Sequence, residues 1–198
     1  APVGGGLAHA EPHQDPPPTL MVLGAPLKAS SAGGSRAIAL EEFFTDYYET
    51  VLKPDEIITE VSVPRLPANS GGAFVKFLPR TADDYATVSA AAVVILDRAR
   101  KIFTDVRIAL GSVGTTPIRA REAEAVLRGQ PVKREALREA AEKVRQAVDP
   151  VSDFRGSAAY KKEMAVVFVR RALEMALDNL PKKSKARRSP KASRRRNK

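Results

Sequence analysis

Within residues 86–96 and 102–110, every second residue along one face is apolar, which predicts two β-strands that each have an apolar face. A third strand is expected over 72–78, and the polar segment 97–101 has the composition of a turn. The stretches follow one another closely, so we expect a three-stranded antiparallel meander. The side chains predicted to share a buried face are Val88, Ala90, Ala92, Val94 and Leu96 in one strand and Val106, Ile108 and Leu110 in the next.

Three helices are predicted after these strands, because apolar residues then recur every three or four positions. The stretches are 119–128, which stops at Gly129, then 133–148 and 158–177. Strands grouped first and helices grouped second indicate an α+β fold, in which three helices cover one face of a small antiparallel sheet.

The first 66 residues carry shorter patterns. Residues 57–63 alternate and predict a strand, whereas 27–30 and 36–40 predict a hairpin, and 41–44 predicts one helical turn. Residues 1–19 are rich in glycine and proline, so we expect a shaped loop there. A short helix is expected next, over residues 16–23, with Asp15 as its N-cap.

Composition divides the chain into three parts. A boundary near residues 65–71 separates a first part, 1–66, from a second, 71–180. The net charge is +10, but residues 181–198 hold ten basic and no acidic side chains, so the rest of the chain is neutral. This tail also lacks any apolar residue larger than alanine, and we expect it to be disordered and dispensable for folding.

Two absences limit the chemistry. The chain has no cysteine, which excludes disulfides, thiolate metal ligands and cysteine nucleophiles on this chain. No stretch approaches the length of a membrane span and none resembles a signal peptide, so a cytoplasmic location is expected.

The strongest candidate for chemistry is the run Gly4, Gly5 and Gly6, which leads towards Asp15 and a helix start. Glycines let backbone amides approach a phosphate closely, and a helix N-terminus favours anions, although a plain surface loop is the alternative. Lys76, between two apolar residues of its strand, could reach a phosphate or an anionic ring, or it could be an edge-strand lysine that extends into solvent.

Other polar groups are weaker candidates. His9 and His13 are four residues apart with Glu11 between them, but Pro12 interrupts any helix that would align them on a metal, so solvated loop histidines are the simpler interpretation. Three carboxylate groupings show no pattern that favours acid–base catalysis over capping or solvation. They are Asp83–Asp84, Asp153 and Glu41–Glu42.

Five ordered segments resemble one family, the FAD-carrying medium subunit or domain of the molybdenum hydroxylases, such as aerobic carbon monoxide dehydrogenase and xanthine dehydrogenase. VGGGLAHAEPHQDPP is similar to the family's second flavin-binding stretch, and EEFFTDYYETVLKPDEIITEVSVP to the signature that follows it. FVKFLPRTADDYATVSAAA, GSVGTTPIRAREAEAVLRG and DPVSDFRGSAAYKKEMAVVFVRRAL resemble segments of its C-terminal domain. The resemblance covers nearly everything from Val3 to Leu177.

The resemblance implies a fold, a cofactor and partners. Residues 1–66 would be the C-terminal part of an FAD-binding domain. Gly4, Gly5 and Gly6 would pass close to the phosphates and ribityl chain of FAD, Asp15 would contact the ribityl–pyrophosphate region, and Ile58 and Lys76 would lie beside the flavin ring or adenine.

The resemblance also implies an electron path. Electrons would come from a molybdopterin on a large subunit, through two 2Fe–2S clusters on a small subunit, to FAD on this chain and then to an external acceptor.

The sequence departs from the family pattern in ways that weaken the expected site. Gly6 stands where the family usually has Asn, and Pro2 where it has Thr or Ser. The family's first glycine-rich loop lies upstream of everything present here, so we expect the chain alone to bind FAD weakly. Two other functions stay open: a subunit-docking module without cofactor, and polyanion binding through the basic tail.

Overall fold

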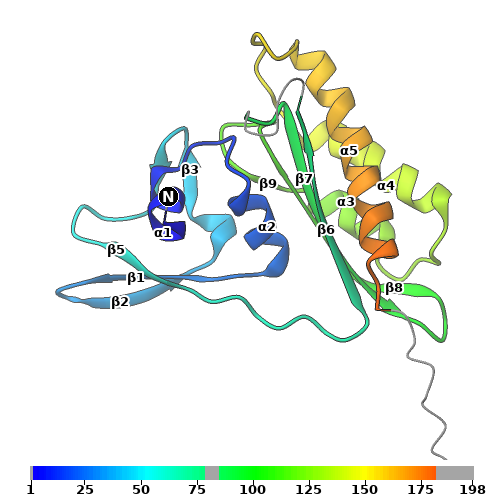
Figure 1. Cartoon of the computed structure of the whole chain (residues 1–198), viewed down its shortest axis with the longest axis horizontal. Helices are drawn as coiled ribbons and strands as arrows, with labels where there is room; N and C mark the ends of the chain where they lie inside the picture. The colour runs from blue at the N-terminus through cyan, green and yellow to red at the C-terminus, as the bar shows by residue number, and fades with distance from the viewer. Residues whose placement is uncertain (1, 79–84, 182–198) are drawn as a thin grey trace, which may run out of the picture.

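The computed structural model describes residues 2–78 and 85–181. Asp83, Asp84 and nearly all of the basic tail lie outside the described residues. Within the described part, no helix is both long and apolar enough to cross a membrane. The elements in chain order (Figure 1) are α1 (Val3–His9), α2 (Pro16–Leu23), β1 (Leu27–Ser31), β2 (Gly34–Ile38), a 3-10 turn η1 (Leu40–Glu42), β3 (Phe44–Asp46), β4 (Glu49–Thr50), β5 (Ile57–Val61), β6 (Ser70–Phe77), β7 (Val88–Asp97), β8 (Ile102–Gly111), β9 (Ile118–Arg119), α3 (Arg121–Leu127), α4 (Arg134–Ala147) and α5 (Ala158–Asp178).

The predicted meander is confirmed, but its sheet has four strands rather than the predicted three. Strands β6, β7, β8 and β9 are antiparallel neighbours in that order. The added strand β9 pairs with β8 through Arg119 opposite Ala109 and Ile118 opposite Leu110. Two residues are too few to show a period of two in the sequence, which is why this strand was not predicted.

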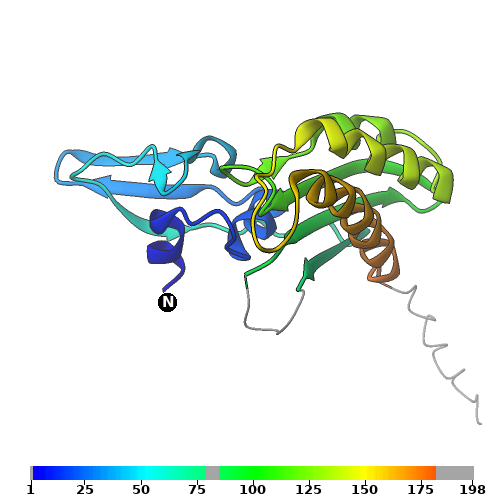
Figure 2. The same cartoon turned by 90° about the horizontal axis from the view of Figure 1, so that it is seen from above.

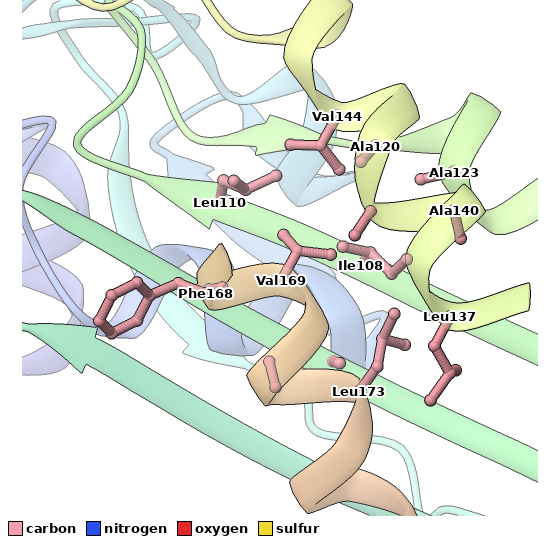
Figure 3. Packing of buried hydrophobic residues seen from close by; sticks show 14 of the residues in the cluster. Ile108, Leu110, Ala120, Ala123, Leu137, Ala140, Val144, Phe168, Val169 and Leu173 are labelled. Carbon is pink, nitrogen blue, oxygen red and sulfur yellow. The ribbon is translucent and has the colours of Figure 1, made fainter. Parts of the chain in front are cut away.

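The three predicted helices cover one face of this sheet (Figure 2). Helices α3 and α5 contact the strands, and α4 packs against both helices. Figure 3 shows their apolar side chains meeting those of the sheet, with Ile108 and Leu110 opposite Val144 and Val169. The side chains predicted to share the buried face of β7 all belong to this cluster, which confirms the period-two prediction.

The opposite face of β7 is buried too. Ala91, Val93 and Ile95 belong to a second apolar cluster that also contains Leu7 and Phe43 from the first part of the chain. Both faces of β7 are therefore covered by protein. The division of the chain into two domains near residues 65–71 stays a prediction, because this cluster draws on both sides of it.

The first part contains a small sheet with the strand order β2–β1–β5, which extends away from the larger sheet (Figures 1 and 2). The hairpin of β1 and β2 confirms the prediction, with Ser31 opposite Gly34 at the turn. The two-stranded pair of β3 and β4 was not predicted, and its strands of three and two residues are again too short to show a period.

The prediction of a loop at the three glycines is wrong, because residues 3–9 form helix α1. Each glycine inside a helix costs about 1 kcal/mol relative to alanine, so local propensity opposes this helix. Tertiary packing explains it, since Leu7 is fully buried in the second cluster and α1 lies against β5. The helix ends at His9, and the C-cap residue Ala10 has a left-handed conformation (φ 52°).

A buried lysine fixes the loop that leads into α5. Lys161 is only 2% exposed, and its Nζ lies 2.8 Å from Oδ2 of Asp153 and 2.9 Å from the carbonyl oxygen of Val151. Partial burial opposes ionisation of Asp153, but hydrogen bonds from Lys161 and from the backbone N–H of Arg155 outweigh it and lower the pKa of this carboxyl.

We expect Asp153→Asn to lower the free energy of unfolding by about 2 kcal/mol at pH 7, and we expect this difference to shrink as the pH falls below the unfolded-state pKa. A lowered folded-state pKa stabilises the fold above the unfolded pKa, near 3.9, and this contribution disappears as pH falls through the folded pKa. Urea denaturation of both proteins across this range measures the difference. Asp149→Asn, at an exposed residue, is the control; an equal and pH-independent loss in both variants would contradict the prediction.

Candidate functional site

The structure brings the predicted site residues together in two pairs. The first pair is Gly4 in α1 and Ile58 in β5: a Cβ built on Gly4 would lie 3.6 Å from the Ile58 carbonyl oxygen and 3.7 Å from its Cβ. This is ordinary van der Waals contact, so the backbone of α1 rests directly on β5. Gly5 and Gly6 follow on the same helix, and a Cβ on Gly6 would lie 3.2 Å from Oε1 of Gln14.

A cavity of about 440 Å³ opens where α1, α2 and β5 meet. Its walls are mostly apolar, with Val3 and Gly4 from the first turn of α1 and Leu20 from α2. The remaining lining residues are Ile58, Thr59, Glu60, Val61 and Val63. Sequence reasoning identified Gly4 and Ile58 but missed the others, because only the crossing of α1 over β5 makes them neighbours.

The first turn of α1 leaves backbone donors available at this cavity. The N–H groups of Val3, Gly4 and Gly5 have no acceptor within the helix, whereas that of Gly6 donates to the carbonyl of Pro2 at 3.0 Å. Pro2 is the N-cap and makes no side-chain cap hydrogen bond.

The second pair is Asp15 and Lys76, whose Oδ2 and Nζ atoms are 3.0 Å apart. The predicted position of Asp15 is confirmed, because it is the N-cap residue of α2. The predicted capping interaction is wrong, because the Asp15 side chain makes no cap hydrogen bond. The three residues that follow are all proline and have no N–H to donate. The carboxylate is thereby left for Lys76, which reaches it from β6.

One oxygen of Asp15 remains without a partner. Oδ1 is buried and has no hydrogen bond among the described residues, and the same holds for the hydroxyl of Ser89, which lies opposite Lys76 in the sheet. A buried polar atom without a partner costs about 1–3 kcal/mol, so each of these atoms lowers the stability of the fold by an amount that a hydrogen-bond partner would offset.

The two histidines have separate partners. Nδ1 of His13 lies 2.6 Å from Oε1 of the buried Glu11, and its ring lies 5.8 Å from that of Tyr85. His9 lies 5.3 Å from the ring of Tyr48. Across residues 2–78 and 85–181, no group of three or more His, Cys, Asp or Glu side chains is arranged to hold a metal ion.

Comparison with known proteins identifies the family of the chain. Residues 1–66 match the family model described as "FAD binding domain in molybdopterin dehydrogenase", and residues 73–176 match "CO dehydrogenase flavoprotein C-terminal domain". The second match alone spans more than half of the chain. The fold is thus the one shared by FAD-binding flavoprotein chains of this type. The chain belongs to the family of FAD-binding medium subunits of the molybdenum hydroxylases.

Individual relatives show the same likeness. The 6-hydroxypseudooxynicotine dehydrogenase complex subunit alpha of Paenarthrobacter nicotinovorans is 38% identical, over 88% of this chain and 58% of that protein. The carbon monoxide dehydrogenase medium chain of Afipia carboxidovorans is 34% identical, over 88% of this chain and 59% of that protein.

A solved carbon monoxide dehydrogenase from Hydrogenophaga pseudoflava superposes with a TM-score of 0.87 at 34% identity, over 91% of this chain and 62% of that one. The chain therefore spans about three fifths of the length of these relatives.

Proposed function

We propose that this chain holds FAD in the cavity between α1 and β5 and carries electrons within a molybdenum-containing dehydrogenase or hydroxylase. The observation that supports the proposal most directly is the largely apolar cavity itself, which Gly4 of α1 and Ile58 of β5 line together. FAD, the cofactor of this protein family, has both an anionic pyrophosphate and a largely apolar ring system.

The residues present fit such a cofactor. Gly4 lets α1 lie directly against β5, because a Cβ there would lie 3.6 Å from the Ile58 carbonyl oxygen, and Ile58 provides an apolar wall of the cavity. Lys76 and Asp15 do not line this cavity, and we propose that they contact a part of FAD that extends beyond it: Lys76 would supply a positive charge, and the unpartnered Oδ1 of Asp15 would accept a hydrogen bond from a hydroxyl such as those of a ribityl chain. FAD supplies the redox chemistry; the protein supplies binding, orientation and electrostatics.

The proposed partners are a large molybdenum subunit and a small subunit with 2Fe–2S clusters. Because this chain has no cysteine, thiolate ligands for such clusters would come from another chain. We propose that electrons arrive from those clusters and leave to an external acceptor. The relatives' names mention carbon monoxide, glyceraldehyde and nicotine chemistry, so we place substrate choice on the molybdenum subunit.

We expect Asp15→Ala and Lys76→Ala each to weaken FAD binding about tenfold or more, because a charge-assisted hydrogen bond contributes roughly 1.5–3 kcal/mol. Titration with FAD, followed by quenching of flavin fluorescence, measures the ratio of dissociation constants to that of the unmodified protein. Lys143→Ala, at an exposed position on α4, is the matched control and should change nothing.

The outcomes separate the alternatives. Equal affinities in all four proteins would show that Asp15 and Lys76 do not contact the cofactor. If the unmodified protein binds no FAD either alone or with its partner subunits, the docking function without cofactor is favoured instead.

A further inference from the structure

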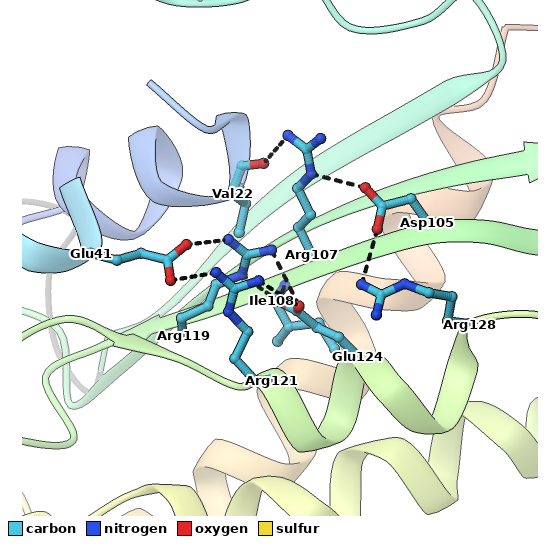
Figure 4. A network of polar contacts seen from close by, with 9 residues as sticks. All are labelled: Val22, Glu41, Asp105, Arg107, Ile108, Arg119, Arg121, Glu124 and Arg128. Carbon is cyan, nitrogen blue, oxygen red and sulfur yellow. Dashed lines mark hydrogen bonds and ion pairs between the residues drawn. The ribbon is translucent and has the colours of Figure 1, made fainter. Parts of the chain in front are cut away.

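Four arginine side chains line a second cleft, also of about 440 Å³, where the end of α2 meets β8, β9 and α3 (Figure 4). They are Arg107, Arg119, Arg121 and Arg128. Leu23, Gly24 and Pro64 form the apolar part of the lining, and Asp105 is its one acidic residue. Arginine is the side chain best suited to bind phosphate and carboxylate groups, because its planar fork donates two parallel hydrogen bonds.

The carboxylates around the cleft do not neutralise it fully. Glu124 is only 1% exposed and is turned inward, where it accepts hydrogen bonds from Arg119 and from the backbone N–H of Ile108 at 2.8 Å. Glu41 bridges Arg119 and Arg121 at 2.6 Å each. Counting Asp105, three carboxylates face four guanidinium groups, so the network keeps a net positive charge (Figure 4).

Donor groups are also in excess. Each guanidinium has five N–H donors, and the contacts in this network use only some of them. Arg107 donates Nε to Asp105 at 3.0 Å and one amino group to the Val22 carbonyl at 3.4 Å, which is long for a hydrogen bond. Arg128 uses one amino group on Asp105, at 3.2 Å. The side chains of Arg107, Arg121 and Arg128 are 28%, 62% and 49% exposed, so solvent reaches them.

The arginines are held in place before any ligand arrives. Asp105 fixes Arg107 and Arg128 on its two oxygens, and Glu41 fixes Arg119 and Arg121 on its own. Gly24 ends α2 in the left-handed region (φ 68°), and a Cβ there would lie 3.2 Å from an amino group of Arg107. Side chains that are already ordered lose less entropy on binding, which favours affinity.

We propose that this cleft binds the phosphate group of a small anionic molecule, at a site separate from the cavity between α1 and β5. The two sites are neighbours along the chain, because Val63 lines that cavity and Pro64 lines the cleft. The cleft has room for more than a bare phosphate, and its apolar side, at Leu23 and Pro64, would contact the rest of the molecule.

Isothermal titration with inorganic pyrophosphate tests the proposal. We expect saturable binding to the unmodified protein, and a dissociation constant at least tenfold higher in Arg107→Gln and in Arg128→Gln. Arg138→Gln, at an exposed position on α4, should bind as the unmodified protein does. Thermal unfolding of each variant establishes that it is folded; Arg128 contacts only Asp105 in this network, so its variant should keep the fold if Arg107→Gln does not.

Three results would overturn the proposal: no pyrophosphate binding by the unmodified protein, equal binding by all the folded variants, or loss of the arginine-dependent binding when FAD is present at saturation. The last result would assign the cleft to the flavin site. If the arginine variants instead weaken only the association with partner subunits, the cleft is a protein interface. FAD binding that is intact in Arg128→Gln keeps the test independent of the proposed function.

Discussion

Replacing Gly71 with alanine should lower the free energy of unfolding by about 3 kcal/mol. Gly71 lies in β6 where the end of α5 crosses it, and an added Cβ would collide with the carbonyl oxygen of Ala176 and lie 3.0 Å from the backbone nitrogen of Leu180. Both are backbone atoms, so no side-chain rotation relieves the overlap. Either α5 must shift or the strand must bend, and urea denaturation measures the cost.

Gly72 provides a control one residue away. A Cβ at this position would lie 3.6 Å from Cγ2 of Val93 and 3.7 Å from the Ala92 carbonyl oxygen, which are ordinary contacts. Gly72→Ala should therefore change stability by less than about 1 kcal/mol, in either direction. Similar losses in both variants would mean that β-strand glycines matter here for another reason than the close approach of α5.

The elements predicted best from sequence are those whose pattern repeats several times within one element. Strand β7 places five apolar residues on one face at every second position, and α5 repeats its apolar stripe over 21 residues, so each element has enough repeats to identify its type. Strands β9 and β4 have two residues each and carry no periodic signal. Their existence depends on pairing with partners that only the folded chain brings close.

Helix α1 was mispredicted for a different reason. Its three glycines have low helix propensity and predict a loop, but tertiary packing overrides this local preference. The cavity beside it could not be predicted, because it forms between segments more than 50 residues apart in sequence. The missing cap hydrogen bond of Asp15, however, could have been predicted from the sequence. The three prolines that follow Asp15 have no N–H group to donate to its carboxylate, which is therefore left for another partner. Lys76 as that partner is a long-range contact, and only the structure reveals it.

Replacing Leu173 with alanine should lower the free energy of unfolding by about 3 kcal/mol, within a range of roughly 2–5 kcal/mol for such truncations. Leu173 is fully buried, and Figure 3 shows it reaching from α5 into the layer where Ile108 of β8 and Leu137 of α4 also lie. Truncation removes buried methyl groups and leaves a cavity that rigid neighbours on three elements fill only partly.

Glu174, the next residue on α5, is exposed and serves as the matched control. Glu174→Ala removes a side chain from solvent rather than from the core, so its expected change is within about 0.5 kcal/mol. Urea or thermal unfolding of both variants gives the comparison. The two residues are adjacent on one helix, so both substitutions change helix propensity by a similar amount. The difference in unfolding free energy between the two variants therefore measures the contribution of side-chain burial. Equal losses at both positions would show that α5 does not present Leu173 to the sheet.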